Sequence, residues 1–208
     1  MPTLYVFSPS DGAFSAHALS PDAQMPYVRR FPFPVSDFLG GRNTDVCWTD
    51  RRALLALDEL HLLFGRPFSV GRAFLRVGAQ TCSERSQHHT GAAFDIGGAL
   101  RASEREELRL LALDNRLFAY AEPAFLSGNV AHLSLFSCYP QRLRFGETGV
   151  FAFVLQDALL RAGVYRGALT GTVCGETLRA ARRLEMPYPV RDTIGRGVLL
   201  AALSAARN

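Results

Sequence analysis

Two histidines and an aspartate strongly constrain how this chain can fold. Residues 86–95 read Ser-Gln-His-His-Thr-Gly-Ala-Ala-Phe-Asp, and a lone histidine, His132, follows downstream. The glycine and small residues between His88 and Asp95 allow this segment to turn back and present a nitrogen and an oxygen ligand together. His132, on a later strand, would add a third ligand and leave a fourth position open for water. This arrangement is typical of a catalytic zinc site rather than of a closed structural one.

A known family of peptidases has fixed residues at this spacing. The matching positions here are Ser86, His88, Gly91, Ala93, Asp95 and His132. They resemble the zinc D-Ala-D-Ala carboxypeptidase/endopeptidase family of peptidoglycan hydrolases, which shares its fold core with lysostaphin-type peptidases and the hedgehog signalling domain. The resemblance implies that His88, Asp95 and His132 bind Zn²⁺ and that the substrate is a peptide bond of the peptidoglycan stem.

His89 is a rival of His88 for the metal. The spacing to Ser86 and Asp95 favours His88, so we expect His89 at the rim of the site. Ser86 is expected to lie at the substrate side of the site and to orient a ligand through a hydrogen bond.

The general base is the point at which the chain departs from the family. Many relatives have an acidic residue three positions before the last histidine, where this chain has Asn129, which cannot act as a base. If residues 117–122 and 130–136 form a hairpin, Glu122 lies opposite His132, with Cβ atoms ~5 Å apart. We therefore expect Glu122 to be the catalytic base. Asn129 also leaves open an alternative, a non-enzymatic peptidoglycan-binding protein that retains the metal fold.

Recognition of a substrate carboxylate usually requires an arginine, because a guanidinium matches a carboxylate in bidentate geometry. In the family this arginine precedes the metal motif. By position Arg76 is the better candidate here and Arg72 the second, although either could be a surface charge.

Residues 141–208 show a different pattern, of helices separated by glycine turns. They resemble the three-helix peptidoglycan-binding module often attached to wall hydrolases, with Thr170 and Thr193 replacing an aspartate and a glycine of its usual pattern. The matching positions are Gly146, Gly149, Leu155, Gln156, Gly163, Tyr165, Leu169, Gly171, Thr177 and Gly195. We therefore expect a zinc peptidase domain over residues 1–139 and a peptidoglycan-binding module over residues 141–208.

The first part of the chain has an α+β pattern. Its expected helices begin at Thr49, ending at Gly65, and at a capping box of Ser103 and Glu106. Its expected strands are Leu4–Phe7, Tyr27–Phe31, Pro67–Leu75, Leu117–Glu122 and Val130–Phe136. The fold class predicted is thus an antiparallel-sheet zinc peptidase domain followed by a small three-helix module.

Charge and composition narrow the classes of partner. All 23 basic residues are arginines, and residues 141–208 hold 10 of them against 5 acidic residues. A basic module could adhere to an anionic cell wall; no nucleic-acid motif is recognisable. No apolar run approaches the ~20 residues of a membrane span, and residues 1–7 do not resemble a secretion signal. We expect a monomer in the cell wall or outside the cell, exported by a route the sequence does not reveal.

The four cysteines, Cys47, Cys82, Cys138 and Cys174, are widely scattered, without a C-x-x-C pair. They could form two disulfides, but their placement favours small buried apolar side chains.

Overall fold

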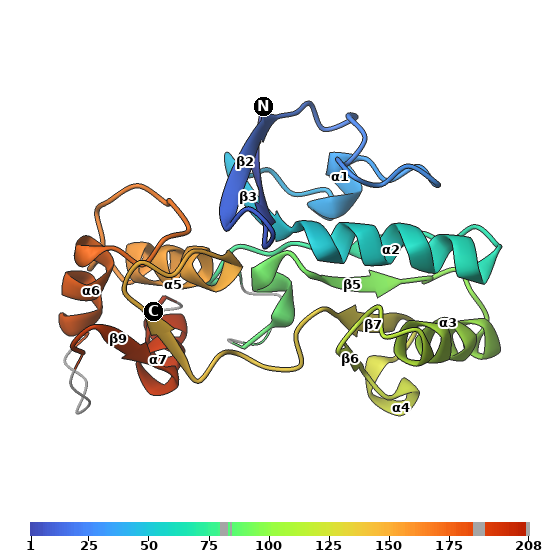
Figure 1. Ribbon diagram of the computed structural model, residues 1–208. Coiled ribbons are helices and arrows are strands. Elements are labelled where there is room, and N and C mark those ends of the chain that lie inside the picture. Colours follow the sequence, from blue (N-terminus) through green and yellow to red (C-terminus); the bar gives the residue numbers. More distant parts are fainter. Residues whose placement is uncertain (80–82, 84, 185–189, 207–208) are drawn as a thin grey trace.

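The computed structural model describes residues 1–79, 83, 85–184 and 190–206. Within these residues it contains seven α-helices and three mostly antiparallel sheets, so the expected α+β class is confirmed. Figure 1 shows the C-terminal helices on one side of the molecule and the sheet with the metal motif on the other.

The N-terminal sheet has the strand order β2-β1-β3. β1 (Thr3–Ser8) pairs antiparallel with β2 (Ala13–Ala18) and parallel with β3 (Val46–Asp50). A strand over Tyr27–Phe31 was expected, and this prediction is wrong. Tyr27 has a φ of 67°, a left-handed conformation that a strand does not contain. The short helix α1 (Val35–Phe38) follows instead.

Helix α2 (Arg51–Phe64) begins one residue later than predicted. The carboxylate of Asp50 accepts a hydrogen bond from the Arg52 amide and caps the helix. The expected cap, Thr49, instead donates its hydroxyl to the carbonyl of Gly91 at 2.6 Å. Gly65 ends the helix in the left-handed conformation, as predicted.

A second, antiparallel sheet has the order β4-β5-β7-β6 and carries the metal motif. Its strands are β4 (Val70–Arg72), β5 (Ala93–Ile96), β6 (Tyr120–Ala121) and β7 (Ala131–Ser134). They are shorter than the expected runs, and helix α4 (Ala124–Ser127) forms part of the connection between β6 and β7.

Helix α3 (Ala102–Asp114) packs against β7 and α2. Its capping box uses Glu104, whose carboxylate accepts from the amide of Arg101 at 2.8 Å. The box predicted from Ser103 and Glu106 is therefore wrong, because Glu106 pairs with Arg109 along the helix.

The C-terminal segment contains the three predicted helices: α5 (Val150–Arg161), α6 (Gly175–Arg182) and α7 (Arg196–Ala205). A two-stranded sheet of β8 (Arg142–Arg144) and β9 (Thr193–Gly195) holds the start of α7.

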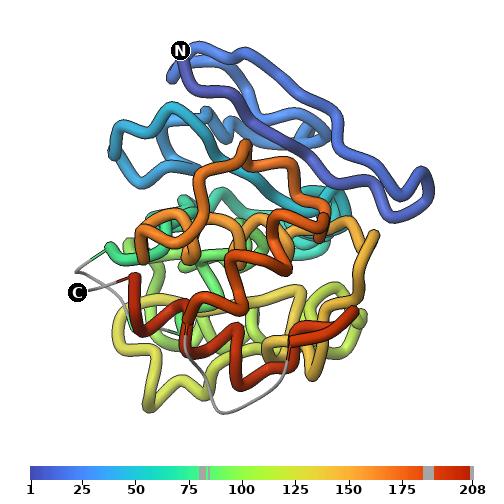
Figure 2. The backbone as a smooth tube through the Cα atoms, turned by 90° about the vertical axis from the view of Figure 1, so that its left-hand side faces the viewer, coloured from blue at the N-terminus to red at the C-terminus, as the bar shows by residue number. Residues whose placement is uncertain are grey.

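The two halves of the chain share one hydrophobic core. The ring of Phe153 on α5 stacks on that of Trp48 on β3, with centroids 5.1 Å apart. Beside them the side chain of Asp157, fully buried, accepts hydrogen bonds from Arg76 Nε at 3.1 Å and from the amide of Val77 at 3.0 Å. Figure 2 shows the C-terminal segment lying along the rest of the molecule. The boundary near residue 140 therefore separates two sequence patterns, but not two cores.

In the described part of the chain, no helix is long and apolar enough to cross a membrane. Cys47, Cys138 and Cys174 are free thiols. Cys47 is buried, as expected, and burial raises its pKa to about 12. The expectation is wrong for Cys138, which is exposed, and Cys174 is half-buried. Cys82 lies outside the described residues.

Asp157→Ala is expected to destabilise the protein by ~3–5 kcal/mol, because it leaves the largely buried guanidinium of Arg76 without its main carboxylate partner. Urea denaturation measures the difference. The control Asp114→Asn removes one negative charge at an exposed helix end and should change stability by at most ~0.5 kcal/mol. Equal stability of the two variants would show that the two segments do not depend on this pair.

Candidate metal centre

Four polar side chains form a row across the second sheet. In its register Arg72 pairs with Asp95, and Asp95 pairs with His132. The amide of Glu122 donates to the carbonyl of His132 at 2.9 Å, which continues the register of β6 and β7 by one residue. Directly paired residues of antiparallel strands project to the same face. The expected pairing of Glu122 with His132 is thus present in the backbone register.

The turn before β5 brings His88 to this row. Residues Gln87–Thr90 form a single 3₁₀ turn, and the hydroxyl of Ser86 accepts a hydrogen bond from the amide of His88 at 3.3 Å. Gly91 ends the turn with a φ of 65°. A Cβ atom there would lie 1.9 Å from the carbonyl oxygen of Trp48, so only glycine allows the chain to enter β5 at this point.

The three predicted ligands converge. His132 Nδ1 lies 2.7 Å from Asp95 Oδ1, and His88 Nε2 lies 3.2 Å from the same oxygen. One ligand atom from each residue lies within 4.8 Å of the other two, close enough to hold a metal ion.

Hydrogen bonds on the outer side of each ring determine which nitrogen faces inward. His88 Nδ1 lies 3.3 Å and 3.2 Å from the carbonyl oxygens of Ala73 and Ala93. Since carbonyls only accept, this nitrogen carries the hydrogen, and a neutral His88 directs the lone pair of Nε2 toward Asp95.

Gln87 acts in the same way on His132. Gln87 Nε2 donates to the carbonyl of Phe136 at 2.9 Å, which leaves Gln87 Oε1 to accept from His132 Nε2 at 2.9 Å. A neutral His132 therefore also directs a lone pair inward, at Nδ1. Two imidazole nitrogens and a carboxylate then face one point with no hydrogen between them, an arrangement that a bound cation stabilises.

Asp95 is ionised in this setting. Burial opposes its ionisation, but when the rings of His132 and His88 carry a second proton, their hydrogen bonds and positive charge lower the pKa of Asp95 well below its usual range. A cation bound by the neutral rings would take the place of those protons. Arg72 Nε lies 3.7 Å from the outer oxygen, Oδ2, and further favours the charged carboxylate.

His89 is not the rim residue that was expected. Its side chain is buried, and its Nδ1 lies 2.9 Å from the carbonyl oxygen of Leu75. Burial lowers the pKa of His89. His89 is therefore a buried side chain beneath the site and not a rim residue.

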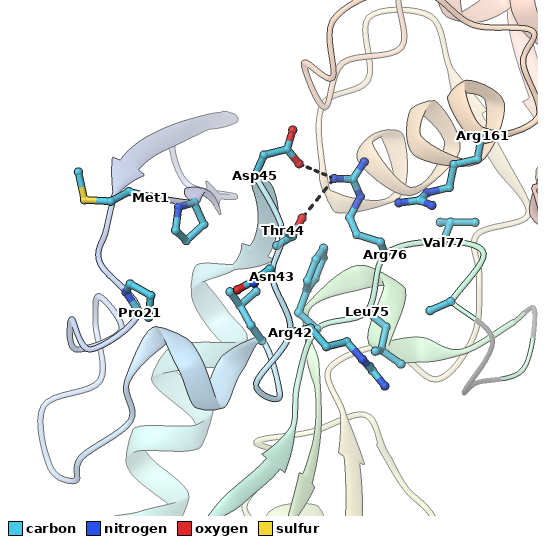
Figure 3. A pocket seen from close by; sticks show the side chains of 14 residues that line it. Met1, Pro21, Arg42, Asn43, Thr44, Asp45, Leu75, Arg76, Val77 and Arg161 are labelled. Carbon is cyan, nitrogen blue, oxygen red and sulfur yellow. Dashed lines mark hydrogen bonds and ion pairs between the residues drawn. The ribbon is translucent and has the colours of Figure 1, made fainter.

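The structure reverses the order of preference between the two candidate arginines. Arg76 is bound to the buried carboxylate of Asp157. Figure 3 shows its guanidinium also in contact with Thr44 and Asp45. It is therefore a poor candidate for binding substrate. Arg72, the second choice, lies beside Asp95 and is partly exposed.

A cleft of about 440 Å³ opens beside the metal cluster and is lined by His132, Glu122 and Ser86. Gln87 and Tyr120 also line it and were not predicted from the sequence. Tyr120 could have been found from strand periodicity, since it precedes Glu122 by two residues and shares its face. Gln87 could have been suspected from its place next to His88.

Asn129, at the position of the missing acid, is exposed in the turn after α4 and does not line the cleft. The described acidic side chain that does line the cleft is Glu122.

Comparison of the chain with models of protein families, with curated proteins and with solved structures found no match.

His88→Ala and His132→Ala are each expected to lose the bound metal, since each removes one of three protein ligands. Elemental analysis of purified protein measures metal per chain. Gln87→Ala should keep the ligands but lower metal affinity ~10–100-fold, because it frees the His132 ring. The control His17→Ala, in β2, should retain the wild-type content. Unchanged metal in both ligand variants would contradict the assignment.

Proposed function

We propose that this chain is a zinc-dependent peptidase that hydrolyses peptide bonds of the peptidoglycan stem. The observation that supports this most directly is the row across the sheet, in which Glu122 pairs with His132, one of three convergent metal ligands, and lines the same cleft.

The donor set fits zinc. Two imidazole nitrogens and one carboxylate oxygen form a ligand set typical of hydrolytic zinc sites, and His132 lines a cleft through which a substrate could approach. When bound, zinc would polarise the scissile carbonyl and acidify the attacking water.

Glu122 would take up the proton of the attacking water on its carboxylate and return it to the leaving amine. Burial, together with the negative charge of Glu122, raises the pKa of Tyr120. The phenol of Tyr120 therefore stays protonated and is available to donate a hydrogen bond to negative charge that develops on the carbonyl oxygen.

The C-terminal segment would bind the cell wall. Its basic excess is partly concentrated in a cleft of about 360 Å³, which is lined by Arg166, Arg179 and Arg183 together with Glu176. Guanidinium groups in a concave surface suit the carboxylates of stem peptides. The proposal places the protein in the bacterial cell wall or outside the cell.

The second candidate is a non-enzymatic peptidoglycan-binding protein that retains the metal site. Asn129, in place of the family's usual acid, favours it. Mass spectrometry of muropeptides after incubation with the zinc-loaded protein distinguishes the two candidates and also identifies the bond that is cut. Zinc binding without cleavage, on walls of several chemical types, would favour the binding protein.

Glu122→Gln is expected to retain zinc and fold but to lose hydrolysis by ~10²–10⁴, the usual contribution of a general base. The rate of amine release from purified peptidoglycan measures this. Glu59→Gln, on the partly exposed face of α2, removes the same charge and should leave the rate unchanged. Near-wild-type turnover of Glu122→Gln would exclude Glu122 as the base.

Replacing both Arg179 and Arg183 with glutamine is expected to weaken binding of the full chain to purified sacculi, most strongly at low salt. Co-sedimentation measures the bound fraction. The variant Arg142→Gln/Arg144→Gln, on exposed positions of β8, makes the same change in charge outside this cleft and should bind as the wild type. If both variants bind equally, the cleft of α6 is not the wall-binding site.

A further inference from the structure

The cleft beside the metal cluster is built by both halves of the chain. Glu122, His132 and Tyr120 line it from the sheet, and Arg196 lines it from the C-terminal segment. Arg196 is the first residue of α7. The segment expected to bind the wall therefore also contributes a side chain to the cleft in which we place hydrolysis.

The Nε of Arg196 lacks the carboxylate partner that several other partly buried arginines have. Its Nε is buried and has no hydrogen-bond partner among the described residues. By contrast, the Nε of Arg76 donates to Asp157, and that of Arg109 donates to Glu106. One other described arginine, Arg51, has such an Nε, and its guanidinium stacks over the ring of Tyr27.

The backbone around Arg196 is held firmly. The amide of Arg196 donates to the carbonyl of Gln141 at 2.8 Å, and Gly195 pairs with Arg142 in the sheet of β8 and β9. α7 in turn packs against α5. A binding group on such a support loses little conformational entropy when a ligand arrives.

The charges that line the cleft favour an anionic ligand. Two guanidiniums, of Arg85 and Arg196, face it with the single described carboxylate of Glu122. No ion pair joins Arg196 to Glu122 within the described part of the chain. A buried guanidinium nitrogen without a hydrogen-bond partner, such as Arg196 Nε, is costly, and a carboxylate is the group that matches guanidinium donors best.

We propose that Arg196 binds a carboxylate of the substrate peptide, so that the C-terminal segment determines substrate specificity as well as wall binding. The identity of the ligand as a stem peptide rests on the proposed function. The observations on Arg196 themselves point only to an anionic group in the cleft, whatever its source. Arg196 of α7 would then bind the substrate carboxylate, the role for which the sequence favoured Arg76.

The test compares a synthetic stem pentapeptide, L-Ala-γ-D-Glu-L-Lys-D-Ala-D-Ala, with its counterpart amidated at both free carboxyl groups. Calorimetric titration into the zinc-loaded full chain with the background change Glu122→Gln measures affinity with little hydrolysis. We expect the free acid to bind ~10–100-fold more tightly than the amide. Adding Arg196→Gln should abolish this preference. Peptides amidated at one carboxyl group identify which of the two is bound.

Arg196→Lys keeps the positive charge but loses the planar pair of donors, and is expected to retain only part of the preference. If the Arg196→Gln variant unfolds at a clearly lower temperature in a thermal scan, the Arg196→Lys variant alone tests whether Arg196 causes the preference for the free acid. Arg142→Gln, on the strand next to Gly195, is the matched control and should bind as the parent does. In the active protein, Arg196→Gln should raise KM for the free acid ~10-fold or more and change kcat little.

Equal binding of acid and amide by the parent protein, or an unchanged preference in both Arg196 variants, would overturn the inference. The outcome is separable from that of the proposed function. Cleavage of peptidoglycan without a carboxylate preference leaves the peptidase proposal intact and removes the role of Arg196. If the protein shows no hydrolysis but prefers the free acid through Arg196, the role of Arg196 stands and the peptidase proposal is removed.

Discussion

The pairing of β5 with β7 is the constraint on which the site depends. It places Asp95 directly opposite His132, so two ligands that are far apart in the sequence meet on one face of the sheet. The same two strands also position the residues on either side. Arg72 pairs with Asp95 across β4 and β5, and Glu122 pairs with His132 at the end of β6. A slip of one residue in this register would turn His132 to the opposite face and destroy the cluster.

The third ligand depends on packing beneath the sheet. Gly91 lies against the carbonyl of Trp48, and the hydroxyl of Thr49 holds the carbonyl of Gly91. The indole of Trp48 also donates to the carbonyl of His89 at 2.9 Å. The end of β3 thus determines the path of the turn that carries His88. Because Phe153 stacks on the same Trp48, the C-terminal helix α5 supports the turn from behind.

Much of the fold could be predicted from local patterns. Apolar periodicity located α2, α3 and the three C-terminal helices, because an amphipathic helix is specified by residues close in the sequence. The missed features were of a different kind. No residue of β2 is buried, and only pairing with β1 makes this segment a strand. The cap of α2 moved from Thr49 to Asp50 because Thr49 is used by a turn distant in the sequence.

For the site, the sequence by itself determined which side chains can act as ligands: the spacing of His88, Gly91 and Asp95 allows a tight turn with two donors. It also supplied the register argument for Glu122, since a hairpin pairs residues in a fixed order. Only the tertiary structure decided how the arginines are used. Arg76 and Arg72 lie four residues apart and are chemically identical, but one meets the buried Asp157 and the other meets Asp95. Arg196 reaches the cleft through the packing of α7, and no local pattern encodes that approach. Charge pairing in a folded protein depends on distances through space. These distances are set only when the core packs, so they cannot be read from the order of the residues.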